Sequence, residues 1–351
     1  MRQIVDGANG FVASHLIAEM LARGQQVTAL ARSPAETVRQ RVGDALACLG
    51  HNPALANGVP VLSLHLHQPD LGGLPAGQVF ADPCVYWHSA ALVTFNPGRN
   101  ADMLPVNVDG TARALAVFER HAWQGSRFVA ISTAYQCGLD TADVAEDWPL
   151  PAEPDRFRNF YEYTKRQAEL LMRPSQTANR GNLAVVRLGV VTGHSRTGLA
   201  LTDSGLYDFL RVITFYARRA PAQPVRIVCH PQANLHLMPI DRTIDRLLPL
   251  ATADLAHPVF HLVGGAVPVG DVFAAINTHL PIRLVPTTPE QLQQAAFTRF
   301  EAAVNMQVKY TATYLKHRYG FQVRDPQPAQ AVTPAVLDRL IGWYVSEGFP
   351  S

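Results

Sequence analysis

The chain has 351 residues, with 48% hydrophobic and 17% charged side chains and a formal net charge of +2. This composition is typical of a globular enzyme, is too polar for a membrane protein, and gives no basic stripe for nucleic acid. No apolar run reaches the ~18 residues of a membrane-spanning helix and no secretion signal opens the chain, so we expect a cytoplasmic protein.

The first half of the chain alternates short β-branched runs with helical stretches, which predicts a parallel sheet built from βαβ units. A capping box at Ser33-Pro34-Ala35-Glu36 is expected to open one of the helices. The other expected elements are strands at Gln3–Val5, Val27–Ala31, Val59–His65, Val85–His88, Phe128–Ser132 and Leu183–Val191, and helices at Phe11–Arg23, Met103–His121 and about Phe160–Met172.

The pattern loosens after about residue 195, where Pro and His become frequent. Strands are expected near Val225–Val228 and Val259–Val263, and Thr333-Pro334 is expected to cap a last helix that ends at Glu347. We therefore predict an α/β protein, with a Rossmann-type doubly wound parallel sheet and a smaller C-terminal substrate-binding lobe. The expected core covers residues 1–195, with later segments at about 225–265 partly returning to it, and residues 196–351 mainly form the lobe.

A glycine loop, Gly7-Ala8-Asn9-Gly10-Phe11-Val12-Ala13, follows the first strand and opens the first helix. Glycines permit a tight turn and close backbone approach to a pyrophosphate, which the helix N-terminus then stabilises. Asp6 is unexpected there, because it places a carboxylate directly before the phosphate loop. A plain tight turn is the alternative. The residues predicted to bind a dinucleotide are Gly7, Asn9, Gly10, Phe11 and Val12.

The residue after the second strand separates the two nicotinamide cofactors. A carboxylate there binds a ribose 2′-hydroxyl, whereas an arginine suits a 2′-phosphate. The chain has Arg32 at this place and no acidic residue nearby. The sequence therefore predicts NADP(H), although a solvated arginine at a helix start is common in an arginine-rich chain.

Lysine is rare in this chain: of 30 basic residues only Lys165, Lys309 and Lys316 are lysines. Lys165 follows Tyr161 by four residues, so the two share one helix face at about 5–6 Å between Cβ atoms. We expect the ammonium to lower the pKa of a phenol that otherwise titrates near ~10, which would make Tyr161 a proton donor near neutral pH. Arginine would not replace the compact ammonium in bridging a phenol and a ribose.

Five motifs occur in the order that is found in extended short-chain dehydrogenases/reductases, and the chain resembles that superfamily. Its finer resemblance, over about residues 3–265, is to the thioester reductase and fatty acyl-CoA reductase (male-sterility) branch. The superfamily motifs are the glycine loop, His88-Ser89-Ala90-Ala91, Asn107-Val108-Asp109-Gly110-Thr111, Ser132-Thr133-Ala134-Tyr135 and Tyr161-x-x-x-Lys165; the branch segments are Leu71-Gly72, residues 159–169, Arg187-Leu188-Gly189, residues 193–198, Pro239-Ile240-Asp241 and His261-Leu262.

The resemblance implies a set of catalytic residues. Thr133 would polarise a carbonyl and contact the substrate, Tyr161 would donate a proton, and Lys165 would hold the phenol and the nicotinamide ribose. Asn107 would brace this network. The alternatives are a strand threonine that bonds only to backbone and a simple surface asparagine.

The resemblance also implies binding residues. Ser89, Ala90 and Ala91 would line the cofactor site, together with Tyr161 and Lys165. His65 stands near the place where the family has an aspartate that approaches adenine, so we expect it to substitute there. Ser195 and Arg196 would bind a phosphate of a pantetheine arm, and an ordinary polar loop is the alternative.

The implied function is NADP(H)-dependent reduction of an acyl thioester, carried on CoA or on an acyl carrier protein, to an aldehyde or alcohol. The alternatives are a reductase of a free ketone or aldehyde, a sugar-nucleotide epimerase, and a non-catalytic NADP-sensing protein. We expect a small-molecule or tethered acyl substrate, a monomer or homodimer, and no nucleic-acid or membrane partner. No metal is expected, because the thirteen histidines lack a matching carboxylate set and the four cysteines form no CxxC pair.

Overall fold

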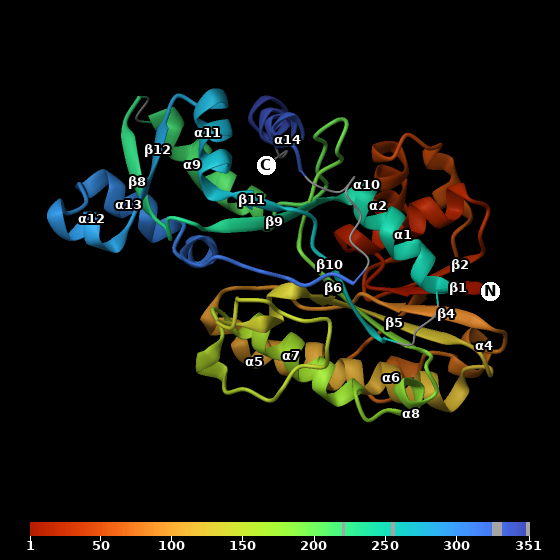
Figure 1. The fold of residues 1–351 in the computed structure, drawn as a ribbon. Helices are drawn as coiled ribbons and strands as arrows, with labels where there is room; N and C mark the ends of the chain where they lie inside the picture. Colours follow the sequence, from red (N-terminus) through yellow and green to blue (C-terminus); the bar gives the residue numbers. More distant parts are fainter. Residues whose placement is uncertain (220–221, 254–256, 325–331, 349–351) are drawn as a thin grey trace. The chain divides into compact units, whose positions relative to one another are not determined.

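The computed structural model describes residues 1–219, 222–253, 257–324 and 332–348, which divide into two compact units (Figure 1). The first unit consists of Met1–Asp140, Ala145–Leu188 and Thr243–Leu262, and the second of Thr141–Val144, Gly189–Arg242 and Val263–Ser351. The chain thus leaves the first unit after Leu188 rather than at residue 195, and the returning segment is shorter than 225–265. Residues 220–221, 254–256, 325–331 and 349–351 of the expected ranges lie outside the described residues.

The first unit contains a seven-stranded sheet in the order β10-β6-β5-β4-β1-β2-β3, with every strand pair parallel. This order confirms the predicted Rossmann-type doubly wound sheet, and it places the reversal of strand order between β1 and β4. All residues of β2, β4 and β6 are buried, as expected for parallel strands covered on both faces. The strands are β1 (Arg2–Asp6), β2 (Val27–Ala31), β3 (Val61–Ser63), β4 (Cys84–His88), β5 (Arg127–Thr133), β6 (Leu183–Leu188) and β10 (Val259–Leu262).

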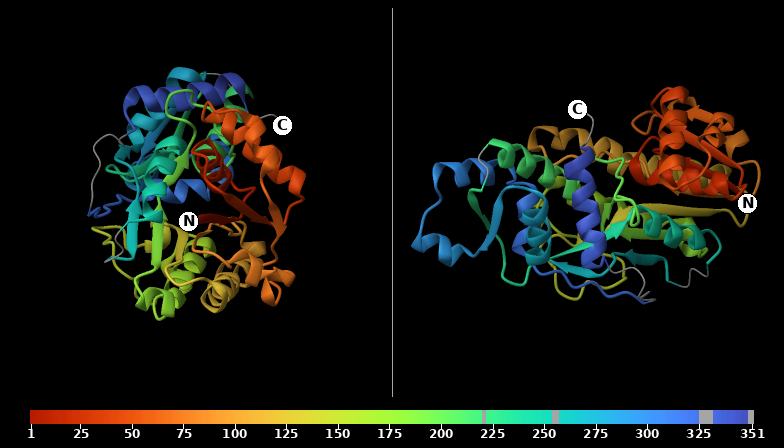
Figure 2. Two further views of the ribbon diagram at one scale, coloured as in Figure 1. Left: turned by 90° about the vertical axis from the view of Figure 1, so that its right-hand side faces the viewer. Right: turned by 90° about the horizontal axis from the view of Figure 1, so that it is seen from above.

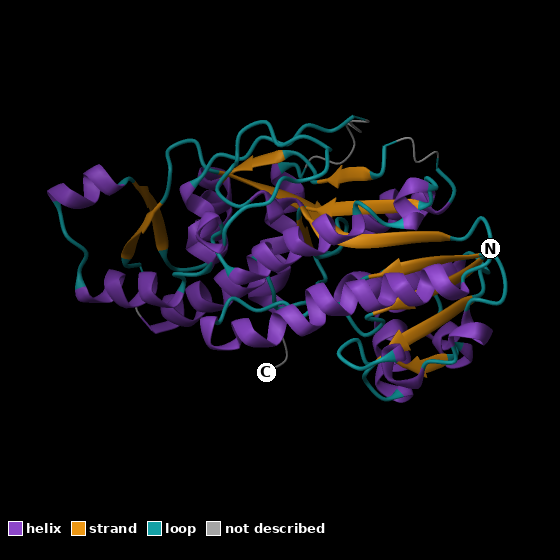
Figure 3. Cartoon of the chain, turned by 90° about the horizontal axis from the view of Figure 1, so that it is seen from below, coloured by secondary structure: helices purple, strands orange, loops and turns teal. Residues whose placement is uncertain are grey.

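Helices cover both faces of this sheet: α1 (Phe11–Ala22) and α2 (Ala35–Cys48) lie on one face, and α6 (Asp109–His121) and α7 (Phe160–Met172) on the other (Figure 1). Figure 3 distinguishes the helices, strands and loops of the chain by colour. The helix expected from Met103 is interrupted by a π-helical turn, Leu104–Val108, which includes Pro105. The shorter helices are α3 (Asp70–Gly73), α4 (Ala76–Val79), α5 (Asn100–Met103) and α8 (Gln176–Asn179), and α10 (Ile240–Leu247) crosses from the second unit into the first. Among the described residues, no helix has the length and apolarity needed to span a membrane.

Two local predictions are wrong. The expected capping box at Ser33 does not form, because α2 begins at Ala35 with Pro34 as its N-cap and no side-chain cap. The expected strand Leu183–Val191 is divided at Gly189 into β6 and β7 (Val190–Thr192), which belong to different sheets. A Cβ at Gly189 would lie 2.6 Å from the carbonyl oxygen of His236 and 3.0 Å from that of Val263, so only glycine fits this crossing of backbones.

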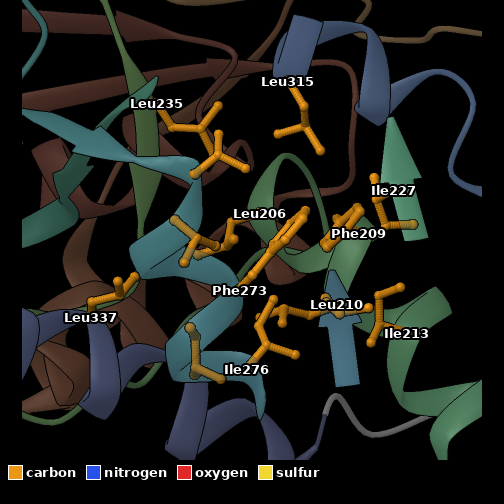
Figure 4. Packing of buried hydrophobic residues seen from close by; sticks show 14 of the residues in the cluster. Leu206, Phe209, Leu210, Ile213, Ile227, Leu235, Phe273, Ile276, Leu315 and Leu337 are labelled. Atoms are coloured by element: carbon orange, nitrogen blue, oxygen red, sulfur yellow. The ribbon is translucent and has the colours of Figure 1, made fainter. Parts of the chain in front are cut away.

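The second unit is built around two small sheets and a continuous apolar core. One sheet has the order β11-β9-β7 and the other pairs β12 with β8. Its apolar core includes Phe209 and Phe273, whose rings stack 6.1 Å apart (Figure 4). The elements are β8 (Pro224–Val228), β9 (Asn234–Pro239), β11 (Ala266–Pro268), β12 (Arg283–Thr287), α9 (Leu206–Arg219), α11 (Val269–His279), α12 (Pro289–Gln294), α13 (Arg299–Gln307) and α14 (Pro334–Glu347).

The last helix forms as predicted. Thr333 is the N-cap of α14, and its side chain accepts a hydrogen bond from the backbone N–H of Val336. The helix runs without interruption to Glu347 (dark blue in Figure 2), and its buried face, which includes Leu337 and Leu340, joins the core of the second unit.

Candidate active site

The glycine loop lies between the end of β1 and the start of α1. Gly7 has φ +62°, and a Cβ there would lie 2.8 Å from the backbone N and Cα of Ala90, so the loop requires glycine at this position. Gly10 donates to the carbonyl of Gly7 at 2.7 Å and is the N-cap of α1. Gly10 brings no side-chain cap and the first turn holds no acidic residue. Ala8 is buried and Phe11 and Val12 are half-buried.

This arrangement fits a dinucleotide phosphate. The first N–H groups of a helix have no intrahelical partner, and they carry the positive end of the helix dipole. In α1 no side chain of the described first turn competes for them, and Asn9 and Gly10 are exposed. An anion at this helix start would therefore meet free backbone donors rather than displace a cap.

Asp6 joins the ends of β1 and β4, where the strand order reverses. Its Oδ1 accepts from the backbone N–H groups of Ser89 and Ala90, at 2.6 and 2.7 Å. The carboxylate is fully buried and faces β4, which explains how an acidic residue precedes the phosphate loop. The structure thus brings the predicted cofactor residues Gly7, Ser89 and Ala90 together, and Ala91 follows them half-buried.

The residues predicted to select the adenosine half of the cofactor follow β2 and β3. Arg32 is exposed directly after β2 and makes no ion pair within the described parts of the chain. Ser33 follows Arg32, and its hydroxyl accepts a hydrogen bond from the side chain of Asn9 at 3.0 Å, so the first loop and the start of α2 are connected. His65 follows β3 half-buried, with Nε2 3.1 Å from the Ser63 hydroxyl.

Tyr161 and Lys165 lie one turn apart on α7, as the spacing predicts. Asn159 caps this helix, because its Oδ1 accepts from the N–H of Glu162 at 3.0 Å. Lys165 is buried, and its Nζ donates to the carbonyl of Ile131 on β5 at 2.8 Å. Burial lowers the pKa of Lys165 to about 8, although the Glu169 and Asp6 carboxylates oppose that shift.

The expectation that Lys165 lowers the pKa of Tyr161 is wrong in this structure. Burial of the half-exposed phenol, with the Glu162 charge adding to it, raises the Tyr161 pKa. The Lys165 ammonium is directed to a backbone carbonyl of β5 instead. Tyr161 therefore holds its proton at neutral pH, as a proton donor must.

Thr133 is the last residue of β5, two residues beyond the carbonyl that receives Lys165. Its Oγ1 accepts from the N–H of Tyr135 at 3.3 Å and makes a long bond, 3.4 Å, to the carbonyl of Leu188. The half-buried hydroxyl is thus held at the carboxyl edge of the sheet by weak partners. Strong contacts fix its surroundings: the hydroxyl of Ser132 donates to Glu169 of α7 at 2.6 Å.

Two arginines tie α7 to the turn after Thr133, Ala134–Cys137. Arg158 makes a buried ion pair with Glu162 at 2.9 Å and donates to the carbonyl of Tyr135. Arg166 donates to both the carbonyl and the side-chain oxygen of Gln136. Buried charges that are hydrogen-bonded in this way favour one arrangement, so these contacts fix α7 relative to the turn that follows β5.

Asn107 lies in the π-helical turn before α6 and is buried. Its side chain accepts from the N–H of Leu92 at 2.7 Å and donates to the carbonyl of the same residue. It also donates to the hydroxyl of Thr164, which in turn donates to the carbonyl of Tyr161. Asn107 thus connects the segment after β4 to the helix that carries Tyr161.

Ser195 and Arg196 belong to the second unit. Ser195 is buried, and its hydroxyl donates to Asp241 at 2.6 Å, so this oxygen is held by the protein itself rather than presented to a ligand. This geometry favours the structural alternative for Ser195. Arg196 is exposed and its backbone N–H donates to His194.

Several residues of this site escaped sequence reasoning. Asp6 was noted only as an anomaly, and the roles of Glu162, Thr164 and Glu169 in fixing α7 were not foreseen. A signal existed for Glu169: it follows Lys165 by four residues on the same helix face. It forms a buried ion pair with Arg187 at 2.7 Å.

A doubly wound sheet with a glycine loop after β1 and a Tyr-x-x-x-Lys helix against β5 defines an extended short-chain dehydrogenase/reductase. The model of an NAD-binding family described as "Male sterility protein" matches residues 5–247. The chain belongs to this family. The predicted superfamily and branch are confirmed, and with them an oxidoreductase type of protein and a nicotinamide dinucleotide as the class of cofactor.

Two curated proteins and one solved structure illustrate the similarity. The chain is 31% identical over 198 residues to cinnamoyl-CoA reductase 2 of Medicago truncatula, covering 54% of this chain and 53% of that protein. It is 31% identical over 172 residues to a 4-hydroxy-2-methyl-3-oxo-4-farnesyl-3,4-dihydroquinoline-1-oxide ketoreductase of Stigmatella aurantiaca, covering 49% and 45%. These matches span about half the length of each curated relative.

The fold is similar to the terminal R domain from the myxalamid PKS-NRPS biosynthetic pathway. The TM-score is 0.78 with 22% identity, over 99% of this chain and 91% of that one. This likeness extends through both units and shows the fold.

Proposed function

We propose that the chain is an NADP(H)-dependent reductase of an acyl thioester, carried on CoA or on a carrier protein, with Tyr161 as the proton donor. The observation that carries this proposal is Lys165, whose buried ammonium reaches the β5 carbonyl of Ile131 one helical turn from Tyr161 and two residues before Thr133. Membership of the male sterility family and the similarity to a cinnamoyl-CoA reductase support a thioester substrate.

The residues have distinct roles in this proposal. When bound, the nicotinamide supplies a hydride to the carbonyl carbon. The hydroxyls of Thr133 and Tyr161 donate to the carbonyl oxygen, and Tyr161 passes its proton to that oxygen as negative charge develops there. The Lys165 ammonium stabilises the phenolate that remains. The substrate thereby becomes a hemithioacetal, which releases the thiol and leaves the aldehyde; a second reduction would give the alcohol.

The raised pKa of Tyr161 fits this division of roles. The partly buried phenol keeps its proton until the substrate oxygen takes it, and the charge of Lys165 then matters in the transition state rather than in the resting protein. Because the pKa of Lys165 is about 8, the lysine loses its charge above that pH, and we expect turnover to fall there. Asn107 and Thr164 hold the backbone of Tyr161 in place during the transfer.

NADPH oxidation with an acyl-CoA, the matching aldehyde and a ketone analogue tests the substrate. We expect turnover of the acyl-CoA, and a loss of about 100-fold or more in kcat for Tyr161→Phe with NADPH affinity unchanged. Turnover of ketones alone would instead support the second candidate, a ketoreductase, which the Stigmatella aurantiaca relative favours. Turnover of a sugar nucleotide without cofactor consumption would indicate an epimerase, and a Tyr161→Phe protein with unchanged output would indicate a sensor.

Arg32 is the residue we propose for the 2′-phosphate of NADPH, because it is exposed after β2 and is not engaged in an ion pair within the described residues. Arg32→Ala should raise the Kd for NADPH by about 10-fold or more and leave NADH unaffected, since only NADPH carries that phosphate. Arg180→Ala, at another exposed position of the first unit, is the matched control. A wild-type protein that prefers NADH would remove this role.

A further inference from the structure

Asp6 is a buried carboxylate directly beneath the glycine loop, and it is satisfied by four donors. The N–H groups of Ser89 and Ala90 reach Oδ1, and the hydroxyl of Tyr86 and the Nδ1 of His88 reach Oδ2, at 2.8 and 2.5 Å. Burial alone would raise its pKa, but His88 and these donors outweigh it and the pKa is lowered. Asp6 is therefore ionised.

His88 has an acceptor at each ring nitrogen. Nδ1 faces the Asp6 carboxylate, and Nε2 lies 2.9 Å from the hydroxyl of Thr111. That hydroxyl donates its single hydrogen to the carbonyl of Asn107 at 2.7 Å, because a carbonyl has no hydrogen to give. Toward His88 the Thr111 oxygen can only accept. Both nitrogens of His88 must then carry hydrogen.

We propose that His88 is held as an imidazolium and acts as the counter-ion that allows Asp6 to lie beneath the dinucleotide loop. An unpaired carboxylate next to Gly7 would offset the positive potential at the start of α1 and would repel a diphosphate bound there. The pair with His88 removes that net charge while Asp6 keeps the ends of β1 and β4 joined. His88 is thus a positioning residue for cofactor binding, and the inference rests on the dinucleotide binding in the proposed function.

The groups that face His88 are consistent with a single internal ion pair. Tyr86 of β4 is a neutral phenol whose pKa burial raises further, and the ring of Phe128 on β5 lies 5.6 Å away. Thr111 of α6 is uncharged. A further charge is Lys165 of α7, which interacts with Asp6 electrostatically, although no hydrogen bond is seen between the two in the described structure. Loss of the His88 charge would leave Asp6 without its adjacent partner.

A double-mutant cycle tests this counter-ion role through binding rather than turnover. Calorimetric titration of His88→Asn, Asp6→Asn and the double variant with NADPH gives the three Kd values. We expect His88→Asn to weaken NADPH binding by about 10-fold or more, and the added Asp6→Asn to restore most of the loss because it removes the buried charge that has lost its counter-ion. Adenosine, which lacks phosphate, should bind the single variants with unchanged affinity.

Further readouts separate charge from packing. If the double variant bound NADPH more weakly than His88→Asn, His88 would be a packing residue and the proposal would fail. Nitrogen NMR of the wild-type protein at pH 7 should show both ring nitrogens of His88 protonated; a neutral tautomer would also overturn it. His236→Asn, which alters a buried imidazole of the second unit, is the control. If the wild-type protein bound NADPH but did not turn over a thioester, the proposed function would be wrong while the counter-ion role of His88 would still stand.

Discussion

Two of the glycine-containing loops that follow strands differ in whether their polar groups are open to a ligand. Gly7–Gly10 follows β1 in the first unit and Gly193–Gly198 follows β7 in the second. Each holds a glycine in the left-handed region, with φ +62° at Gly7 and +80° at Gly198. The first loop exposes Asn9 and Gly10 at a helix start without a side-chain cap.

The second loop is closed by its own unit. A Cβ on Gly198 would lie 2.5 Å from the carbonyl of Arg339 and 2.6 Å from the Cβ of Trp343, both on α14. Asp241 binds the N–H and hydroxyl of Ser195, and Arg339 donates to the Ser195 carbonyl at 2.7 Å. The difference between the two loops shows that glycine spacing indicates only where a side chain would not fit against neighbouring backbone. Whether a ligand can use the loop depends on which of its polar groups the protein already occupies.

Replacing Gly7 is expected to have the largest effect on binding. In Gly7→Ala the new Cβ would overlap the backbone of Ala90, so the ends of β1 and β4 would move apart. We expect the Kd for NADPH to rise by about 100-fold or more, together with a loss of stability of a few kcal/mol. Gly24→Ala is the control, because Gly24 also has positive φ (+72°) but nothing within 4 Å. Equal effects of both changes would mean that backbone strain alone is responsible.

Replacing Gly198 should lower the stability of the fold rather than the affinity for NADPH. Gly198→Ala adds a Cβ against the carbonyl of Arg339 in a left-handed residue, and we expect a loss of about 2–5 kcal/mol in the free energy of unfolding. NADPH affinity of the folded protein should stay within about 2-fold of wild type. Denaturant unfolding and calorimetric titration provide the two measurements, with Gly348→Ala, at φ +63° in open space, as control. A large loss of NADPH affinity would show that the second loop contributes to that site.

The surroundings of the first loop carry an electrostatic cost that depends on pH. The pKa of Lys165 in the folded protein is about 8, below its ordinary 10.5, so burial disfavours the charged form. Below pH 8 the full cost applies; between pH 8 and 10.5 only the unfolded chain keeps the proton, so stability rises with pH. The free energy of unfolding of Lys165→Met minus that of wild type should therefore be larger at pH 7 than at pH 10.5, by on the order of 1–3 kcal/mol.

Comparison of the two proteins at each pH cancels the titration of groups that they share. The lost hydrogen bond to Ile131 lowers the stability of the variant by a similar amount at every pH below 8, so only the change between pH values reports the charge. A difference that stays constant from pH 7 to 10.5 would show that Lys165 has the same pKa in the folded and the unfolded chain, and that burial therefore does not disfavour its charge. The variant should lack turnover throughout.

Much of the first unit could be predicted from the sequence because its signals are local. Val27–Ala31 and Phe160–Met172 were predicted with the bounds that the structure shows, since β-branched runs and helical spacing specify them directly. The division at Gly189 could not be predicted, because it depends on the distant backbone of His236 and Val263. The capping box at Ser33 failed for a similar reason: the hydroxyl bonds to Asn9 instead.

The candidate site shows the same limit. The spacing of Tyr161 and Lys165 predicted their common helix face, but the direction of the Tyr161 pKa depends on burial, which no local pattern reports. Asp6 looked unfavourable in sequence because its partners, Tyr86 and His88, are provided by a strand that follows nearly eighty residues later and pairs with β1. The ion pair of Asp6 near the first loop could therefore be recognised only once the pairing of β1 with β4 was known.

Ser195 gives the smallest and most discriminating difference between the loops. Its hydroxyl donates to Asp241 at 2.6 Å in a buried setting, so Ser195→Ala should lose about 1–2 kcal/mol of stability by leaving a carboxylate oxygen short of one donor. If that bond is its whole role, KM for the acyl thioester stays within about 2-fold of wild type, whereas Arg196→Ala, which removes an exposed charge from the same loop, raises KM without loss of stability. A rise in KM for Ser195→Ala at unchanged stability would restore the serine as a ligand for the substrate. The second glycine loop would then resemble the first in function as well as in spacing.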